Sequence, residues 1–93
     1  HSGIARDVGL LLYQHADYGL QVAQIAATTG YSGPTIRLVL TRLEEAGAIA
    51  VRSGRGKARI YGLTDRGLAA FDAYVEAVWD FAAQAAVSAA GGP

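Results

Sequence analysis

Basic side chains gather in one short stretch of the sequence, RSGRGKARIY at residues 52–61. The chain has eight lysines and arginines, and four of them lie in this stretch: Arg52, Arg55, Lys57 and Arg59. Guanidinium and ammonium groups on a glycine-containing loop pair readily with phosphate and other anions. The stretch therefore predicts an anion-binding loop; the alternative is a solvated turn, where glycine and charge are both common.

The charges are unevenly distributed although they sum to zero. Residues 37–66 hold seven basic and three acidic residues, a net charge of +4. After Arg66 the only charged residues are Asp72, Glu76 and Asp80, a net charge of −3. A cationic middle favours an anionic partner, and the acidic C-terminal third does not.

Catalysis and metal binding find little support in the residue types. There is no cysteine, and neither of the two histidines has clustered carboxylates at ligand spacing. The serines fall in predicted caps, turns and the C-terminal end, without a base and an orienting group. The string GRGK lacks the first glycine and the final serine or threonine of a phosphate-binding P-loop. We therefore expect no enzyme activity, no metal and no cofactor.

The composition indicates a soluble single domain with apolar surface to spare, and the location expected for it is the cytoplasm. Of 93 residues, 52% are hydrophobic and 17% are charged. No apolar run approaches the roughly 18–20 residues of a membrane span. A chain of this size with so few charges is expected to cover apolar surface with a partner subunit.

Local signals predict four helices and one β-hairpin. The predicted helices cover residues 4–15, 20–29, 33–46 and 65–89, and the predicted strands cover residues 48–53 and 58–63. Ser32 and Thr64 are natural N-caps, and Gly30 and Gly47 are suited to ending helices. The predicted buried stripe of the third helix is Ile36, Val39, Leu40, Leu43 and Ala46.

This order of elements is that of a winged helix-turn-helix, a mostly α fold with a small β-hairpin (α+β), here over residues 4–64. The third helix would lie in the major groove of DNA, with its N-terminal residues nearest the base edges and the hairpin as the wing. Short polar residues and arginines on its open side suit base edges and phosphates. The predicted DNA-binding residues are Ser32, Gly33, Thr35, Arg37, Leu38, Thr41 and Arg42 of the helix, and Arg55, Lys57 and Arg59 of the wing.

The same residues have plainer interpretations. The polar side of the third helix can be an ordinary solvated face, and Arg42 can pair with Glu45 or Asp65. Arg37 has no acidic residue three or four positions away, which favours a DNA contact. Leu38 can contact a thymine methyl group or pack on the first helix.

Two motifs flank the basic hairpin. The first, S-x-x-T…L-x-R-L-E-x-x-G-x-I, consists of Ser32, Thr35, Leu40, Arg42, Leu43, Glu44, Gly47 and Ile49, and the second, Y-x-L-T-x-x-G, of Tyr61, Leu63, Thr64 and Gly67. With them, residues 20–68 resemble the core of the PadR family of bacterial transcriptional regulators and, less closely, MarR-type repressors. Arg37 and Leu38 depart from the tyrosine and proline that many PadR-type recognition helices carry.

The resemblance implies a homodimer formed by the C-terminal helix and a small apolar effector near the dimer interface. The helix over residues 65–89 suits that role by its own chemistry, because monomers seldom expose so wide an apolar face. The predicted dimerisation residues are Leu68, Phe71, Val75, Val78, Trp79 and Ala82. Trp79, Phe71 and Tyr74 form a predicted site for a small planar aromatic effector, although Trp79 can instead fill the dimer core. Residues 1–3 and 90–93 are expected to be disordered or to come from cloning.

The sequence thus predicts a homodimeric, sequence-specific transcription regulator. It would act as a repressor on a pseudo-palindromic operator of double-stranded DNA and associate with the bacterial nucleoid. Two alternatives stay open. One is a sequence-tolerant DNA-binding accessory protein of the nucleoid, plasmid partition or replication. The other is a winged helix used for protein interaction, which the basic bias of residues 37–66 disfavours.

Overall fold

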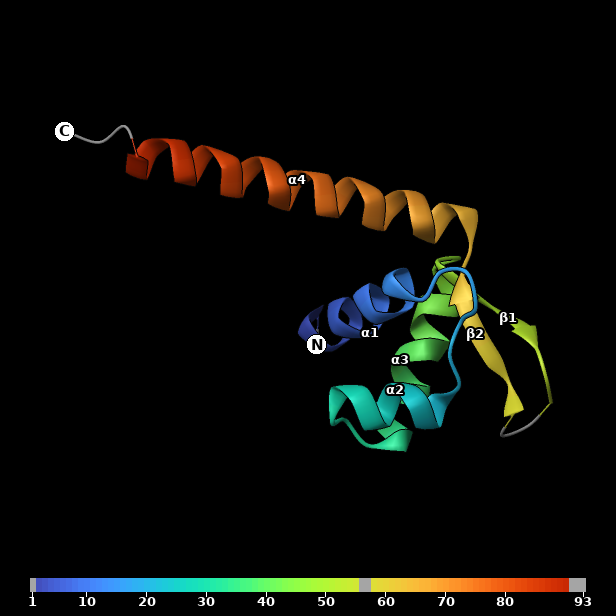
Figure 1. The fold of residues 1–93 in the computed structure, drawn as a ribbon. Coiled ribbons are helices and arrows are strands. Elements are labelled where there is room, and N and C mark those ends of the chain that lie inside the picture. The colour runs from blue at the N-terminus through green and yellow to red at the C-terminus, as the bar shows by residue number, and fades with distance from the viewer. Residues whose placement is uncertain (1, 56–57, 91–93) are drawn as a thin grey trace.

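The computed structural model describes residues 2–55 and 58–90 of the chain. Three helices pack together, a hairpin lies beside them, and a long final helix leaves the domain (Figure 1). The elements are α1 (Ser2–Gln14), α2 (Val22–Thr29), α3 (Gly33–Glu45), β1 (Ile49–Ser53), β2 (Ile60–Leu63) and α4 (Asp65–Ala90). The predicted mostly α fold with a small hairpin and a long C-terminal helix is confirmed. Residues 2 and 3, expected in a disordered end, belong to α1.

Predicted caps fix the ends of the helices around the hairpin. The Ser32 hydroxyl accepts a hydrogen bond from the Thr35 backbone N–H at 3.3 Å, as an N-cap of α3 does. The Thr64 hydroxyl accepts from the Gly67 N–H at 3.1 Å and donates to the Gly47 carbonyl at 2.6 Å. Gly47 has a φ of 78°, which glycine adopts without the steric penalty of other residues. Thr64 therefore joins the end of α3 to the start of α4.

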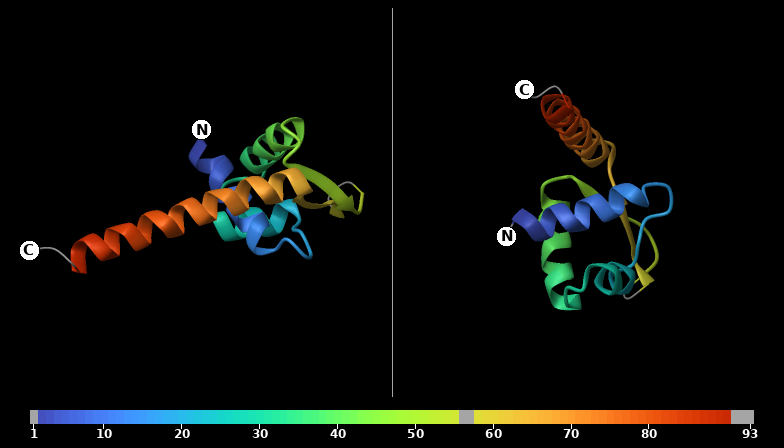
Figure 2. Two further views of the ribbon diagram at one scale, coloured as in Figure 1. Left: turned by 90° about the horizontal axis from the view of Figure 1, so that it is seen from above. Right: turned by 60° about the vertical axis from the view of Figure 1, so that its left-hand side comes forward.

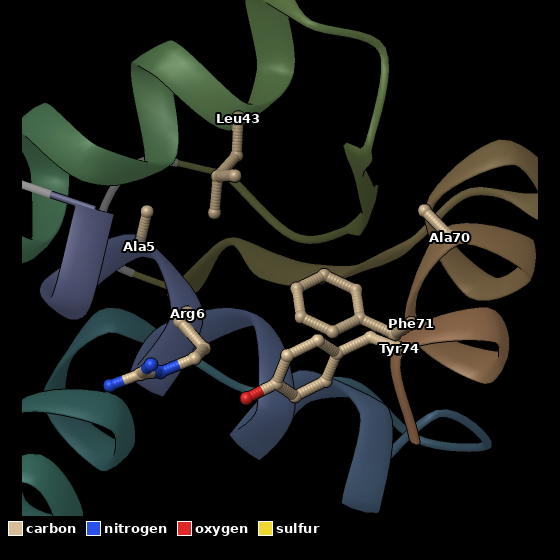
Figure 3. Close-up of a pocket in the computed structure, with 6 residues that line it drawn as sticks. All are labelled: Ala5, Arg6, Leu43, Ala70, Phe71 and Tyr74. Carbon is tan, nitrogen blue, oxygen red and sulfur yellow. The ribbon is translucent and has the colours of Figure 1, made fainter. Parts of the chain in front are cut away.

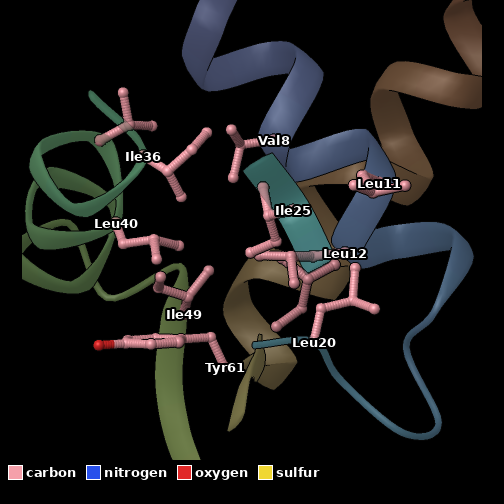
Figure 4. Packing of buried hydrophobic residues seen from close by; sticks show 11 residues of the cluster. Val8, Leu11, Leu12, Leu20, Ile25, Ile36, Leu40, Ile49 and Tyr61 are labelled. Atoms are coloured by element: carbon pink, nitrogen blue, oxygen red, sulfur yellow. The ribbon is translucent and has the colours of Figure 1, made fainter. Parts of the chain in front are cut away.

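Buried apolar side chains from the three packed helices, the α1–α2 loop and the hairpin form one core (Figure 4). They are Val8, Leu11, Leu12, Leu20, Ile25, Ile36, Val39, Leu40, Ile49, Tyr61 and Leu63. In α3 the first three residues of the predicted buried stripe, Ile36, Val39 and Leu40, are buried, and Leu43 is half-buried. Ala46 is exposed, contrary to the prediction, because it is the C-cap of α3 and lies past its packed face.

A short bridge extends the hairpin. β1 and β2 pair antiparallel, with Ile49 opposite Leu63. Leu20 exchanges two backbone hydrogen bonds with Tyr61, at 2.9 and 2.8 Å. The prediction that helix begins at Leu20 is wrong, because these bonds hold its backbone extended at the sheet edge. Gly19, with a φ of 74°, lets the chain pass close to the Tyr61 carbonyl.

The first turns of α4 are seated on α1, and the rest of α4 runs past the domain (Figures 1 and 2). Leu68 and Phe71 are half-buried against the core of their own chain. Gly9 of α1 makes room for the Phe71 ring, because a Cβ at position 9 would overlap that ring.

A hydrogen bond also ties α4 to α1. The Tyr13 hydroxyl donates to the Asp72 carboxylate, and this bond is the main reason that the pKa of Tyr13 is raised above its ordinary value of 10.0. A raised pKa means that the bond stabilises the fold while the phenol is protonated. Its contribution is therefore complete below about pH 10 and is lost as pH rises through the raised pKa.

We expect Gly9→Val to lower the free energy of unfolding by about 1–3 kcal/mol, because the new side chain must displace Phe71. In a Phe71→Ala background the same change should cost much less, since the space is then free. Urea unfolding of the four proteins of this double-mutant cycle measures the coupling. An equal loss of unfolding free energy in both backgrounds would contradict the contact between Gly9 of α1 and Phe71 of α4.

Candidate nucleic-acid interface

One side of α3 faces solvent and carries the predicted DNA-binding residues. Ile36, Val39 and Leu40 are buried on the opposite side. Leu43 packs on the same side, and the helical period of 3.6 residues places Arg37, Leu38, Thr41 and Arg42 away from the core. The exposed residues of α3 are Pro34, Arg37, Leu38, Thr41, Arg42, Glu44 and Glu45. Four of them, Arg37, Leu38, Thr41 and Arg42, belong to the predicted DNA-binding set, and we call these four the outward face of α3. The fold therefore brings these four side chains to one solvent-facing surface.

The first turn of α3 is held by its own side chains. The Ser32 hydroxyl donates to Thr35 Oγ1 at 2.9 Å as well as capping the helix. Both hydrogen bonds of the Ser32 hydroxyl are thus made within the first turn of α3. The Thr35 hydroxyl accepts one of them and can still donate its own proton to a ligand. The Arg37 side chain lies back over Gly33, with Nη1 3.4 Å from the point where a Cβ at position 33 would sit. The Arg37 guanidinium therefore lies beside the first turn of α3, at the positive end of the helix dipole.

The arginines of this face are free to bind. Among the residues that the structure describes, no carboxylate forms an ion pair with Arg37 or Arg42, so the alternative pairing of Arg42 with Glu45 or Asp65 is not formed. Thr41 differs, because its hydroxyl donates to the Arg37 carbonyl at 3.0 Å within the helix. Thr41 can offer a ligand an acceptor oxygen and a methyl group.

Two of the three predicted basic residues of the wing lie in the described part of the hairpin. Arg55, in the turn, and Arg59, just before β2, are exposed. Lys57 lies outside the described residues. Arg52 folds back over Gly62 and donates to the Leu63 carbonyl at 3.4 Å, so it braces the hairpin. The sequence alone does not distinguish Arg52, which folds back on the hairpin, from the other arginines of the stretch.

A cavity of about 330 Å³ that is largely open to solvent lies between α1, α3 and α4 (Figure 3). Its lining is Ala5, Arg6, Leu43, Ala70, Phe71 and Tyr74. Phe71 and Tyr74 belong to the predicted effector site, whereas Trp79 does not line the cavity and is 71% exposed. The sequence did not predict Arg6 and Leu43 as lining residues, because no local pattern indicates that α1 and α3 contact α4 here.

The predicted dimerisation residues divide into two groups along α4. Leu68 and Phe71 pack on their own domain. Farther along, Val75 is half-buried, and Val78, Trp79 and Ala82 are exposed. Phe81 and Val87 add apolar side chains that are 75% and 70% exposed. The distal part of α4 therefore presents an apolar surface to solvent.

Other kinds of site find no support in the part of the chain that the structure describes. Residues 2–55 and 58–90 contain no group of three or more histidine, aspartate or glutamate side chains placed to hold a metal ion. None of the described helices is long and apolar enough to cross a bilayer.

Comparisons with known proteins bear on the fold. No protein-family profile and no curated protein sequence matches the chain. MepR, described as a transcription regulator of the Staphylococcus aureus multidrug efflux pump MepA, is 28% identical with a TM-score of 0.76, over 91% of this chain and 62% of MepR. The S. aureus MepR–DNA complex is 28% identical with a TM-score of 0.70, over 92% of this chain and 62% of that one. AF1382 from Archaeoglobus fulgidus has a TM-score of 0.70 at 18% identity, over 87% of this chain and 89% of that one, and it bears on the fold alone.

The chain thus spans 62% of the MepR chain that it matches. The winged-helix regulator fold implied by the sequence resemblance is confirmed, while the PadR-like assignment stays a prediction. Over the matched part, the protein has the winged-helix fold that MepR, a transcription regulator, also has.

Proposed function

We propose that this protein is a sequence-specific DNA-binding transcription regulator, a repressor of PadR-like type. The observation that carries the proposal is the outward face of α3, where Arg37 and Arg42 are exposed and without a carboxylate partner among the described residues. Such a face suits the major groove, and Arg55 and Arg59 of the wing suit the flanking backbone or minor groove. The likeness to MepR, which is known in complex with DNA, supports this use of the fold.

The proposed regulator is a homodimer, and the distal part of α4 is the proposed contact. Helical spacing continues the row of Leu68 and Phe71 into Val75, Val78 and Trp79. The start of this row packs on its own domain, and the row is exposed from Val78 onward. A second copy offers the same surface, so a two-fold axis lets the two helices cover each other. Residues 65–89 would then be a dimerisation helix beside a DNA-binding domain of residues 4–64.

Paired recognition helices would read a pseudo-palindromic operator. Two-fold dimers contact half-sites about one helical turn apart, roughly 10 base pairs. The spacing of the two α3 helices in this arrangement depends on how α4 leaves each domain. A ligand wedged beside α4 would change that spacing, and operator affinity with it.

Selection from a pool of random DNA duplexes tests the proposal. We expect an enriched sequence with two-fold symmetry that binds at least about 1,000-fold more tightly than a scrambled duplex of the same composition. Equal binding to both duplexes would favour the sequence-tolerant accessory protein. A folded protein that binds neither duplex would favour the protein-interaction module, with distal α4 as the first surface to test.

The proposed effector is a small planar aromatic compound in the cavity beside Phe71 and Tyr74. We expect Tyr74→Ala to weaken binding of such a compound roughly two- to tenfold, because a stacking partner is lost. Titrations followed by Trp79 fluorescence or calorimetry, over a panel of planar aromatic compounds, provide the measurement. Phe81→Ala is the matched control, because Phe81 is on the same helix but does not line the cavity. Binding that Tyr74→Ala leaves unchanged would contradict this site.

A further inference from the structure

One large apolar side chain is exposed in the middle of the outward face of α3. Leu38 is 55% exposed. Among the described residues outside α4, Tyr18 is the only other large hydrophobic side chain so exposed. Leu38 is not among the apolar residues that pack on the core, so the alternative that it packs on the first helix is not formed. A single exposed leucine is common on protein surfaces, and what sets Leu38 apart is its position between two exposed arginines, Arg37 and Arg42, on the outward face of α3.

The residues next to Leu38 reinforce its apolar character. Pro34 is four residues before Leu38 and Thr41 is three residues after it, so the helical period places them beside it. Pro34 has no side-chain donor, and the Thr41 hydroxyl already donates to the Arg37 carbonyl. The three residues form an apolar line along α3, which we call the Leu38 line (Pro34, Leu38 and Thr41). Arg37 and Arg42 lie on opposite sides of this line.

The chemistry of the major groove offers one apolar group on a base edge, the C5-methyl of thymine. A leucine side chain cannot form hydrogen bonds with the donors and acceptors of base edges. The arginines on either side of Leu38 are suited to bind phosphates. The geometry points to Leu38 as a specificity-determining residue that selects thymine by contact with its methyl group. This inference rests on the proposed function, since it assumes that α3 enters the major groove.

Replacing thymine by deoxyuridine tests the inference, because this change removes only the methyl group. The probe is the duplex enriched by selection, with each thymine of one half-site replaced in turn. We expect one or two replacements to weaken binding of the wild-type protein about three- to fivefold, the effect of withdrawing one buried methyl group. Replacement at the other thymines should change the affinity less than about 1.5-fold, since those methyl groups lose no buried contact.

The protein variants decide whether Leu38 is responsible. In Leu38→Ala the difference between thymine and deoxyuridine should disappear, whereas Leu38→Met, which keeps an apolar side chain, should retain it. Leu38 is exposed, so neither change should disturb folding, which circular dichroism checks. A selected duplex whose thymines can all be replaced without loss would overturn the inference and leave the proposed function intact. A loss that persists unchanged in Leu38→Ala would also overturn it. Failure to enrich any duplex would overturn the proposed function, and this inference with it.

Discussion

The double variant Val78→Glu with Trp79→Glu should be monomeric and should bind the operator about a hundredfold more weakly than the wild type. Trp79 is 71% exposed and Val78 is 48% exposed, so both are available to a second copy of α4. Two carboxylates in the proposed apolar contact would be desolvated without partners, which disfavours association. A monomer then binds one half-site at a time and loses the gain of about 100- to 10,000-fold that a linked second site provides.

Sedimentation equilibrium and a DNA-binding titration of the same samples measure the two effects together. Gln84→Glu is the matched control, because it also adds a negative charge to an exposed position of distal α4 and lies on another side of the helix. The domain should stay folded in all variants, since these side chains lie outside the core. A double variant that stays dimeric would contradict the proposed contact. A monomer with full operator affinity would contradict the need for a dimer.

The second large effect is expected at Arg37. Arg37→Ala should weaken binding to the selected duplex by about 1–3 kcal/mol per half-site, roughly 5- to 150-fold, and relax sequence preference at one base pair. The guanidinium has no ion-pair partner among the described residues, so its removal breaks no pair within the protein. It lies near Gly33 at the start of α3, the end nearest the base edges in a major groove.

Arg66→Ala separates a specific loss from a general loss of charge. It removes one positive charge as well, but Arg66 lies in the first turn of α4, with its side chain beside Gly47 at the other end of α3. Titrations with the selected and the scrambled duplex should show a small, uniform effect for Arg66→Ala. For Arg37→Ala they should show a loss mainly on the selected duplex. Equal effects of the two changes would mean that Arg37 contributes only its charge.

Helix ends and the outward face of α3 could be predicted because their signals are local. Ser32 and Thr64 cap the helices that the sequence assigns to them. Leu20 was misplaced because its structure depends on two hydrogen bonds to Tyr61, which is far along the chain. A strand pairing of this kind has no signature in the residues around Leu20.

Contacts between distant segments also limited the prediction of the C-terminal helix. Apolar periodicity predicts that Phe71 packs against another surface, but it does not predict which surface that is. The partner that the structure provides is α1 of the same chain, where Gly9 leaves space for the ring. The cavity beside Phe71 was missed for the same reason, since Arg6 and Leu43 reach it from helices far apart in the sequence.

The salt dependence of DNA binding tests the central claim most directly. The chain has no net charge, so strong binding to a polyanion requires the local basic surface of α3 and the wing. We predict that the logarithm of the binding constant falls linearly with the logarithm of salt concentration, by about 0.9 for each phosphate contact. In Arg55→Ala the slope should be shallower by about 1 per protomer, because one contact is lost. Binding that does not respond to salt, or no binding to duplex DNA even at low salt, would contradict the account.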